Sequence, residues 1–101
     1  MDRRPNLHTQ LVNLLGSRNV YFQPPPSVQM HYPAIVYSRS DIDTKYANNA
    51  VYINDIAYQI IVIDNDPDSE IVMRVANLPK CRFDRHYVSD NLNHDVFTIY
   101  Y

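Results

Sequence analysis

The sequence is poor in the residues on which several common functions depend. Its 101 residues include one glycine, Gly16, so the chain cannot hold a glycine-rich loop of the kind that wraps a nucleotide phosphate. It has one cysteine, Cys81, which excludes an intramolecular disulfide and a cysteine-rich zinc site. Such cysteine usage is typical of a chain in a reducing compartment such as the cytosol.

Long apolar runs and a charge of one sign are also missing. No stretch approaches the roughly 18 apolar residues of a membrane-spanning helix. The N-terminal segment MDRRPNLHTQ lacks the apolar region of a signal peptide. The net charge is −2 with both signs scattered, and Arg3 and Arg4 form the one basic cluster. We therefore expect neither a membrane span nor the basic surface of a nucleic-acid-binding protein.

The composition is globular and rich in tyrosine. Hydrophobic residues make up 46% of the chain and charged residues 20%, which predicts a single compact domain over residues 1–101. There are nine tyrosines and no tryptophan. Tyrosine joins an apolar ring to a polar tip and is favoured at interfaces, but it also has a high strand propensity. The tyrosines therefore indicate either a protein that assembles with other chains or a strand-rich fold.

Two helices are predicted. Four leucines between Pro5 and Leu15 recur on one helical stripe, and Gly16 follows as a C-terminal stop. A second apolar stripe predicts a helix from about Pro67 to Leu78, which Pro79 ends because the residue before a proline avoids the helical region.

Strand patterns fill most of the remaining sequence. The predicted strands are Val20 to Gln23, Pro33 to Ser38, Val51 to Ile53, Ala57 to Ile63, Cys81 to Tyr87 and Val96 to Tyr101. The nearly continuous apolar run from Ala57 to Ile63 predicts a central strand covered on both faces. Polar residues predict a loop from Ser38 to Asn49 and a turn at Asn54-Asp55. The order helix, strands, helix, strands predicts an α+β fold, a largely antiparallel sheet with two helices packed against it.

An acidic run raises the question of a calcium site. Acidic residues alternate in VIDNDPDSE, at Asp64, Asp66, Asp68 and Glu70. An EF-hand loop counted from the first of them needs glycine at its sixth position and glutamate at its twelfth, where this chain has Ser69 and Val75. A helix start fits better, with Asp66 as the N-cap, Pro67 as the first helical residue and the following acidic residues complementing the helix dipole.

Other chemically active residues form no recognisable motif. The four histidines, His8, His31, His86 and His94, lack zinc-motif spacing, although the last two could pair across the final hairpin or stand exposed at strand ends. Basic neighbours on both sides of Cys81 would lower its pKa, whereas its alternation with Phe83 favours a buried structural thiol. We predict no enzymatic activity, no catalytic residue, no cofactor and no metal.

Several stretches together carry a family resemblance: VYFQPP, YPAIVYSRSDIDTKYANN, AYQIIVIDNDPDSEI and LPKCRFDRHYVSDNLNHDVFTIYY. From about Leu11 onward the chain resembles the small tail-completion proteins of long-tailed bacteriophages, the tail terminators. The predicted order of helices and strands is similar to that of this family. The resemblance implies a structural virion protein whose copies form a ring, typically of six. The ring caps the tail tube, stops its polymerisation and presents a docking surface to the head–neck complex.

The resemblance also implies partners and a location. The partners are further copies of the chain, the tail tube protein and a neck or head-completion protein, while DNA passes through the lumen without specific binding and no membrane is involved. The protein is expected at the tail–neck junction of the virion after assembly in the cytoplasm of the host bacterium. Two other readings remain open: a different neck component, such as a head-closure or head–tail connector protein, or a soluble phage-encoded module that binds a host protein.

Interface residues are expected on two segments, because subunits in a closed ring contact each other through two different faces. The first is the polar loop from Ser38 to Asn49, and the second is Val96 to Tyr101 as an exposed edge strand that pairs between subunits. At a lumen, Asp41 and Asp43 would repel DNA, although two nearby cations nearly cancel their charge. The candidate subunit or tube interface residues are Arg39, Asp41, Asp43, Lys45, Tyr46, Phe97, Ile99, Tyr100 and Tyr101.

Overall fold

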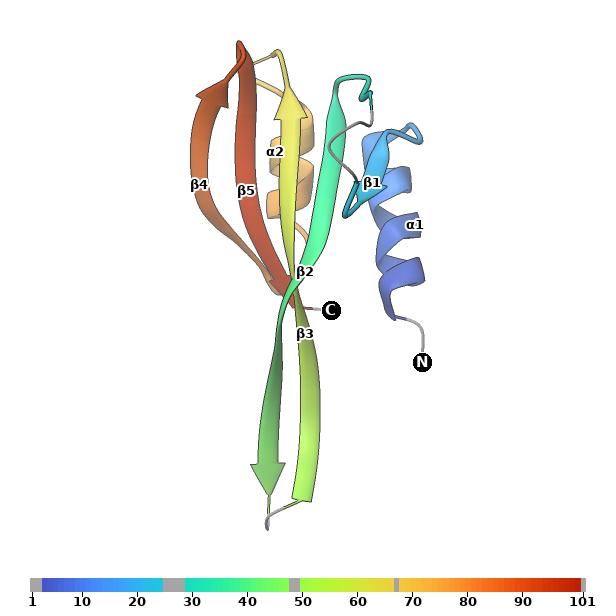
Figure 1. Cartoon of the computed structure of the whole chain (residues 1–101), viewed down its shortest axis with the longest axis vertical. Helices are drawn as coiled ribbons and strands as arrows, with labels where there is room; N and C mark the ends of the chain where they lie inside the picture. The colour runs from blue at the N-terminus through green and yellow to red at the C-terminus, as the bar shows by residue number, and fades with distance from the viewer. Residues whose placement is uncertain (1–2, 25–28, 48–49, 67, 101) are drawn as a thin grey trace.

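A computed structural model describes residues 3–24, 29–47, 50–66 and 68–100 of the chain (Figure 1). Within these residues, two helices and a five-stranded sheet of order β1-β2-β3-β5-β4 confirm the predicted α+β fold. Strands β1 and β2 are parallel, and every other neighbouring pair is antiparallel. The elements are α1 (Arg3–Leu15), β1 (Val20–Phe22), β2 (Ala34–Ala47), β3 (Ala50–Asp64), α2 (Glu70–Ala76), β4 (Cys81–Ser89) and β5 (Leu92–Tyr100).

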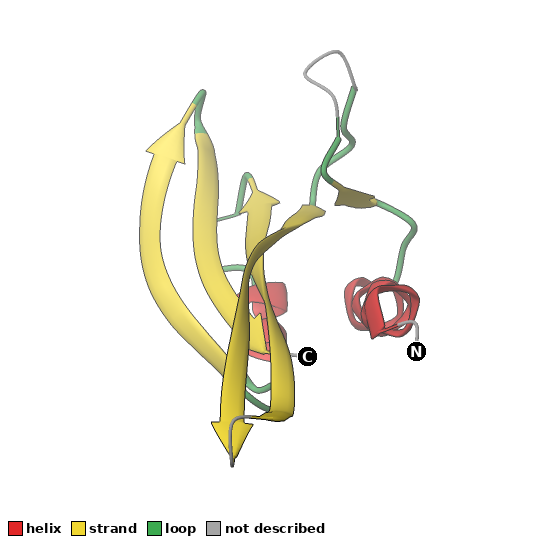
Figure 2. Ribbon diagram, turned by 60° about the horizontal axis from the view of Figure 1, so that its bottom comes forward, coloured by secondary structure: helices red, strands yellow, loops and turns green. Residues whose placement is uncertain are grey.

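Both helices contribute to one core on the same face of the sheet (Figure 2). Successive residues of a strand point to opposite faces, so alternate positions of each strand supply this core. In β3, for example, Tyr58, Ile60 and Val62 belong to it. The other buried members are Leu7, Leu11, Leu15, Val20, Ile35, Tyr37, Ile71, Val75, Phe97 and Ile99.

Helix α1 follows from its leucine stripe. Leu7 and Leu11 are fully buried, and they lie one turn apart, as the spacing predicts. The helix ends at Leu15, where the N–H of Gly16 donates to the carbonyl of Val12 at 2.9 Å. Gly16 has φ +80°, a conformation that glycine adopts without steric penalty. The predicted stop is confirmed, and the helix begins two residues earlier than the predicted start at Pro5.

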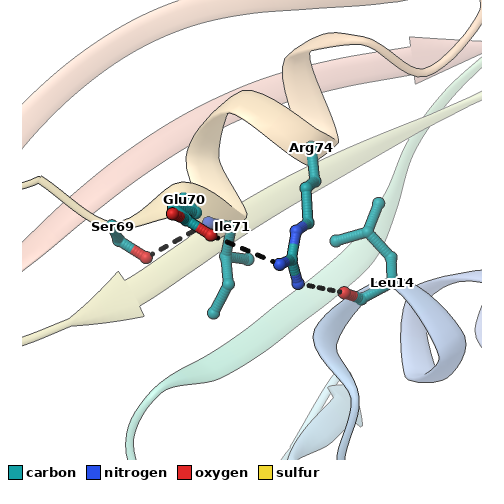
Figure 3. A network of polar contacts seen from close by, with 5 residues as sticks. All are labelled: Leu14, Ser69, Glu70, Ile71 and Arg74. Atoms are coloured by element: carbon teal, nitrogen blue, oxygen red, sulfur yellow. Dashed lines mark hydrogen bonds and ion pairs between the residues drawn. The ribbon is translucent and has the colours of Figure 1, made fainter.

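Helix α2 begins later than predicted. Its N-cap is Ser69, whose Oγ accepts a hydrogen bond from the N–H of Ile71 at 3.3 Å (Figure 3). Ile71 and Val75, one turn apart, form its buried stripe. The helix ends at Ala76, two residues before the predicted end. It is therefore a short helix, held mainly by this one apolar stripe.

The acidic residues before α2 explain why the helix begins later than predicted. The carboxylate of Asp64 accepts from the N–H of Asp66 at 3.1 Å, and that of Asp66 accepts from the N–H of Asp68 at 2.9 Å. Aspartate side chains that bond to the backbone two residues ahead hold it in turns rather than in a helix. The predicted N-cap at Asp66 is therefore wrong, and Pro67 lies outside the described residues.

One side chain of α2 connects the two helices. Arg74 donates from Nη1 to the carbonyl of Leu14 at 3.2 Å and forms an ion pair with Glu70 one turn earlier at 3.4 Å (Figure 3). The Leu14 carbonyl lies in the last turn of α1, where carbonyls lack helical partners and a cation complements the dipole. Because this arginine side chain is 53% exposed, the ion pair contributes at most about 0.5 kcal/mol.

The middle of the chain differs most from the sequence prediction. Residues 38–47 continue β2 instead of forming a loop, and Asn54 and Asp55 lie inside β3 instead of forming a turn. Asn48 and Asn49 lie outside the described residues. In the described chain these parts of β2 and β3 pair only with each other, so they need none of the apolar alternation that a covered strand shows. The polar composition therefore indicated a loop where the chain forms two long strands.

The last two strands form a tight hairpin. Ser89 pairs with Leu92, so the connection consists of Asp90 and Asn91, with φ values of 53° and 63°. Two consecutive positive φ values are typical of a type I′ turn, whose twist matches that of the strands. Aspartate and asparagine tolerate this conformation better than other non-glycine residues.

Candidate assembly surfaces

Strands β2 and β3 extend beyond the rest of the sheet. The last pair between β3 and β5 is Ala57 with Tyr100, whereas β2 and β3 continue their pairing to Ala47 and Ala50. Among the described residues, no third strand pairs with residues 41–47 or 50–56. We call these two segments the arm; they form the two-stranded projection at the bottom of Figure 1.

The arm gives the molecule its elongated shape. About seven residues per strand at about 3.3 Å each reach about 23 Å. The principal extents of the molecule are 51, 24 and 23 Å, so the arm lies along the longest axis. A two-stranded hairpin alone is marginally stable in water, and its two strands expose unpaired backbone groups at both edges. Within the described residues, the arm therefore has backbone hydrogen-bonding groups without strand partners along its outer edges.

Five of the predicted interface residues lie in or beside the arm. Four of them, Asp41, Asp43, Lys45 and Tyr46, fall within one arm strand, and Arg39 lies at its base. The pairing with β3 shifts register between Arg39 and Asp41 and again between Lys45 and Tyr46. The structure thus places these residues along one extended strand rather than on the predicted loop.

The prediction of an exposed edge strand at residues 96–101 is wrong. Strand β5 lies between β3 and β4, so both of its backbone edges are paired, and β4 takes the edge. Phe97 and Ile99 are 0% and 1% exposed and belong to the core, so they offer no surface to a second subunit. Tyr100 is half-buried, and Tyr101 lies outside the described residues. The order of strands in the sequence does not reveal this arrangement, because the last strand of the chain inserts between β3 and β4.

A second surface lies on the opposite side of the sheet from the helices, and we call it the helix-free face. Strand register defines three rows across it. From β2 to β4, the rows are Ala34, Ile63, His94, Tyr87; Val36, Ile61, Val96, Arg85; and Ser38, Gln59, Thr98, Arg82. The first two rows are mainly apolar, and the third is polar.

The apolar rows are separate from the helix-side core. Ala34, Ile63 and Val96 are 0%, 7% and 1% exposed, yet none of them belongs to the core cluster that contains the helices. Val36 and Ile61 are half-buried and are also outside that cluster. Within the described residues, the helix side of 57–63 is covered, and on the other face Ala57 and Ile63 are buried while Gln59 and Ile61 are half-buried, so the predicted cover on both faces is found in part.

A bulge in β4 determines which side chains reach the helix-free face. The predicted alternation placed Cys81, Phe83, Arg85 and Tyr87 on one side. The register shifts between Phe83 and Arg85, which moves Arg85 and Tyr87 to the helix-free face. Phe83 remains on the helix side, with its ring 5.4 Å from that of Phe97, but it is 51% exposed because β4 lies at the edge. The expectation that it alternates inward into a buried site is therefore wrong.

Aromatic and charged side chains line the edge of the helix-free face along β4, which we call its margin. The rings of Tyr87 and His94 stack at 4.7 Å and 12°, and the guanidinium of Arg85 lies 5.6 Å from the Tyr87 ring centre. Arg82 pairs with Asp84 at 3.0 Å. The margin therefore carries two guanidinium groups, one of which is paired within the chain.

The Asp84 carboxyl is held ionised by its neighbours. Thr98 donates to it at 2.5 Å and Arg82 at 3.0 Å. The hydrogen bond from Thr98, followed by those from Arg82, keeps the pKa of this carboxyl below its usual value. The polar row of the helix-free face is thus fixed by a small hydrogen-bonded network.

Cys81 and the histidines do not gather into a site. Cys81 is half-buried, and its burial, assisted by Asp84, raises the pKa of its thiol, which opposes the reactive-thiolate alternative. Strand register places His86 opposite Asp95 and His94 opposite Tyr87. The two histidines lie on opposite faces of the sheet, so the pairing considered across the hairpin is wrong.

The described tyrosines are divided between the core and the surface. Tyr37 and Tyr58 are 1% and 3% exposed and pack in the core, where the hydroxyl of Tyr37 lies 2.7 Å from Nδ1 of His8. Tyr32 and Tyr87 are 44% and 38% exposed. Their count alone could not separate a strand-rich core from an assembly surface.

Two hollows open on the helix side. One of about 310 Å³ lies beside the start of α2 and is lined by Asp68, Ser69, Val72, Met73 and Asp95. Burial raises the pKa of Asp95, although the charges of His86 and His94 oppose the shift. A second hollow of about 250 Å³ is lined by Gln10, Pro79, Lys80, Ile99 and Tyr100. Within the described ranges, no three His, Cys, Asp or Glu side chains are grouped to hold a metal ion.

No helix in the described part of the chain is long and apolar enough to cross a membrane. The comparisons find no match for this chain among protein-family models, curated proteins or solved structures.

Proposed function

We propose that the chain is a tail terminator of a long-tailed bacteriophage. Its copies form a ring, six in the family that the sequence resembles, which caps the finished tail tube. The ring stops tube polymerisation and offers a docking surface to the head–neck complex. The observation that carries the proposal is the arm, a two-stranded projection with which no third described strand pairs.

Within the part of the chain that the structure describes, the arm lacks a third strand to pair with its outer backbone groups. Residues 41–47 and 50–56 gain backbone hydrogen bonds from each other but have no third strand in the described chain. A hairpin of this kind is marginally stable on its own. Contact with another chain would supply the missing partners, as in strand addition or packing on a sheet. This favours a protein that functions as an assembly over one that functions as a single copy.

The proposed partners are those that the family resemblance implies. Further copies of the chain meet first, the tail tube protein lies on one side of the ring and a neck or head-completion protein on the other. DNA passes through the lumen, and the complex sits at the tail–neck junction after assembly in the bacterial cytoplasm. Arm residues Asp41, Asp43, Lys45 and Tyr46, with Arg39 at the base, are the proposed interface residues. The proposal assigns no catalytic group.

Electron microscopy of lysates from a phage or prophage that lacks this gene tests the proposal. Detached tails of uncontrolled length beside filled heads are the expected result, and supplying the intact gene in trans should restore joined particles. Supplying the gene without codons 43–55, with Asn-Gly in their place, should not restore them, because it removes most of the arm.

Other outcomes would redirect the proposal. Filled or leaking heads beside tails of normal length would assign the protein to head closure or to the head–tail connector. Normal infectious particles would contradict a virion role and favour a soluble module that binds a host protein.

A further inference from the structure

We infer that the arm of one copy lies across the helix-free face of the next copy. The inference rests on the proposed function, since it requires that the chain assembles with itself, and it adds which two surfaces meet. Its starting point is the central strand β3, whose residues 57–63 are almost all apolar. Such a run is typical of a strand that is covered on both faces.

The described chain covers β3 less completely on the helix-free face than on the helix side. Tyr58, Ile60 and Val62 belong to the core to which both helices contribute. On the helix-free face Ile63 is buried, whereas Ile61 and its neighbour Val36 remain half-buried. Burying apolar surface from water yields about 25 cal/mol for each Å². A cover over the half-buried Val36 and Ile61 would therefore be favourable, and the sequence of β3 is suited to it.

The arm of the same chain cannot supply this cover. Strand β3 runs without interruption from Ala50 in the arm to Asp64 at the other end of the sheet. The arm therefore continues the direction of the strand and points away from the apolar rows (Figure 1). Any strand pair that covers these rows must come from another molecule.

Charge complementarity favours the arm as the segment that covers the helix-free face. The arm contains Asp41, Asp43 and Asp55 against a single cation, Lys45. The margin of the helix-free face carries Arg85, and also Arg82, which Asp84 pairs within the chain. An acidic arm laid across a face with a basic margin brings opposite charges together, which fixes the register of docking more than it adds affinity.

The dimensions also fit. The four strands that form the rows are separated by three spacings of about 4.8 Å, so the face is about 14 Å across. The arm reaches about 23 Å, so it can span all three spacings. The arm and the helix-free face are different surfaces, so each copy gives one and receives the other. Repetition of such a contact closes a ring or extends a filament.

Disulfide trapping tests the contact directly. In a Cys81→Ser background, Gln59→Cys on the helix-free face is combined with Thr44→Cys or with Lys45→Cys in the arm. The two arm positions are adjacent in the strand, so the two double variants together probe both faces of the arm. Mild oxidation of one of the two double variants is expected to give a ladder of linked copies that reduction collapses.

Matched controls show whether the cross-links report the contact between the arm and the helix-free face. Asn13→Cys, on the exposed side of α1, replaces Gln59→Cys in the control pair and should leave the chain unlinked. If the Gln59→Cys variant alone links into dimers, two helix-free faces pack on each other and the inference is overturned. Assembly by sedimentation with no ladder from either arm position also overturns it, while leaving the proposed function intact.

A second variant tests the apolar rows without a cross-link. Ile61→Gln should weaken self-association at least about tenfold, since it removes apolar burial worth about 1.4 kcal/mol or more. Met73→Gln, at a 63% exposed position on the helix side, is the matched control and should leave self-association unchanged. Unchanged circular dichroism shows that both variants are folded. A wild-type chain that stays monomeric at every concentration contradicts the inference, and normal tails in the gene-deletion lysate separately contradict the proposed function.

Discussion

The turn between β4 and β5 places two consecutive non-glycine residues at positive φ. Asn91 has φ 63°, which a β-branched residue adopts only with strain. Replacing it by valine is expected to lower the free energy of unfolding by about 1–2 kcal/mol. Asn91→Gly, which fits a type I′ turn, should leave stability close to that of the wild type. Urea denaturation of the two variants checks the prediction, and equal losses in both would contradict the turn assignment.

Ser69 is the N-cap of α2 whereas the sequence suggested Asp66, and substitutions can tell the two residues apart. Ser69→Ala removes the acceptor of the Ile71 N–H and should lower the free energy of unfolding by about 1 kcal/mol. Ser69→Asp keeps an acceptor and should retain most of the wild-type stability. Thermal melts of both variants measure the difference. Asp66→Ala is the comparison variant: a larger loss there than at Ser69 would support the cap that the sequence suggested.

Two carboxyl groups should respond oppositely to pH. Burial raises the pKa of Asp95, so its contribution to stability is fully present below the ordinary aspartate pKa, about 3.9, and is lost as the pH rises through the raised value. Asp95→Asn should therefore be more stable than the wild type at pH 7, and the difference should disappear below about pH 4. Urea denaturation across this range measures it.

Asp84 is the matched control. Its pKa is lowered, first by the hydrogen bond from Thr98, so its contribution is present above the ordinary pKa and lost as the pH falls through the lowered value. Asp84→Asn should therefore be less stable than the wild type at pH 7. Shifts of the same sign for Asp84→Asn and Asp95→Asn would contradict the environments assigned to the two groups.

At the scale of elements, the arm should be the least protected regular structure in the free chain. Its amides are held by one partner strand, whereas those of residues 58–63 lie in a strand paired on both edges. In dilute protein, hydrogen exchange in the arm should be at least about a hundredfold faster than in residues 58–63. Assembly should slow exchange in the arm. Equal protection of both segments in the monomer would show that the arm is stable without a partner.

The sequence predicted the elements whose patterns are local. The leucine stripe of α1 and its stop at Gly16 depend on residues within a few turns, and both were found where expected. The N-cap of α2 was misplaced because several acidic residues compete for the same backbone groups, and only their geometry selects Ser69.

The sequence could not reveal features that depend on distant pairing. Polar residues 38–47 resemble a loop, because an arm with no third strand needs no apolar alternation. The last strand resembles an edge, because nothing local shows that β5 inserts between β3 and β4. Two of the expected interface residues, Phe97 and Ile99, are therefore core residues, whereas Arg39 and the arm residues lie along one strand.

At the scale of the molecule, two incomplete features lie at opposite ends of one long strand. Strand β3 carries the arm at its beginning and the apolar rows of the helix-free face toward its end (Figure 1). One copy cannot bring them together, but neighbouring copies can. This arrangement is the basis of the proposed ring.

Native mass spectrometry of the purified chain tests this central claim most directly. The wild type at high concentration is expected to form one closed species with a fixed number of 11.9 kDa copies. The variant with Asn-Gly in place of residues 43–55 should remain a monomer with a melting temperature within a few degrees of the wild type. A variant without the arm that forms the same closed species would contradict the claim, because the ring would then assemble without the arm.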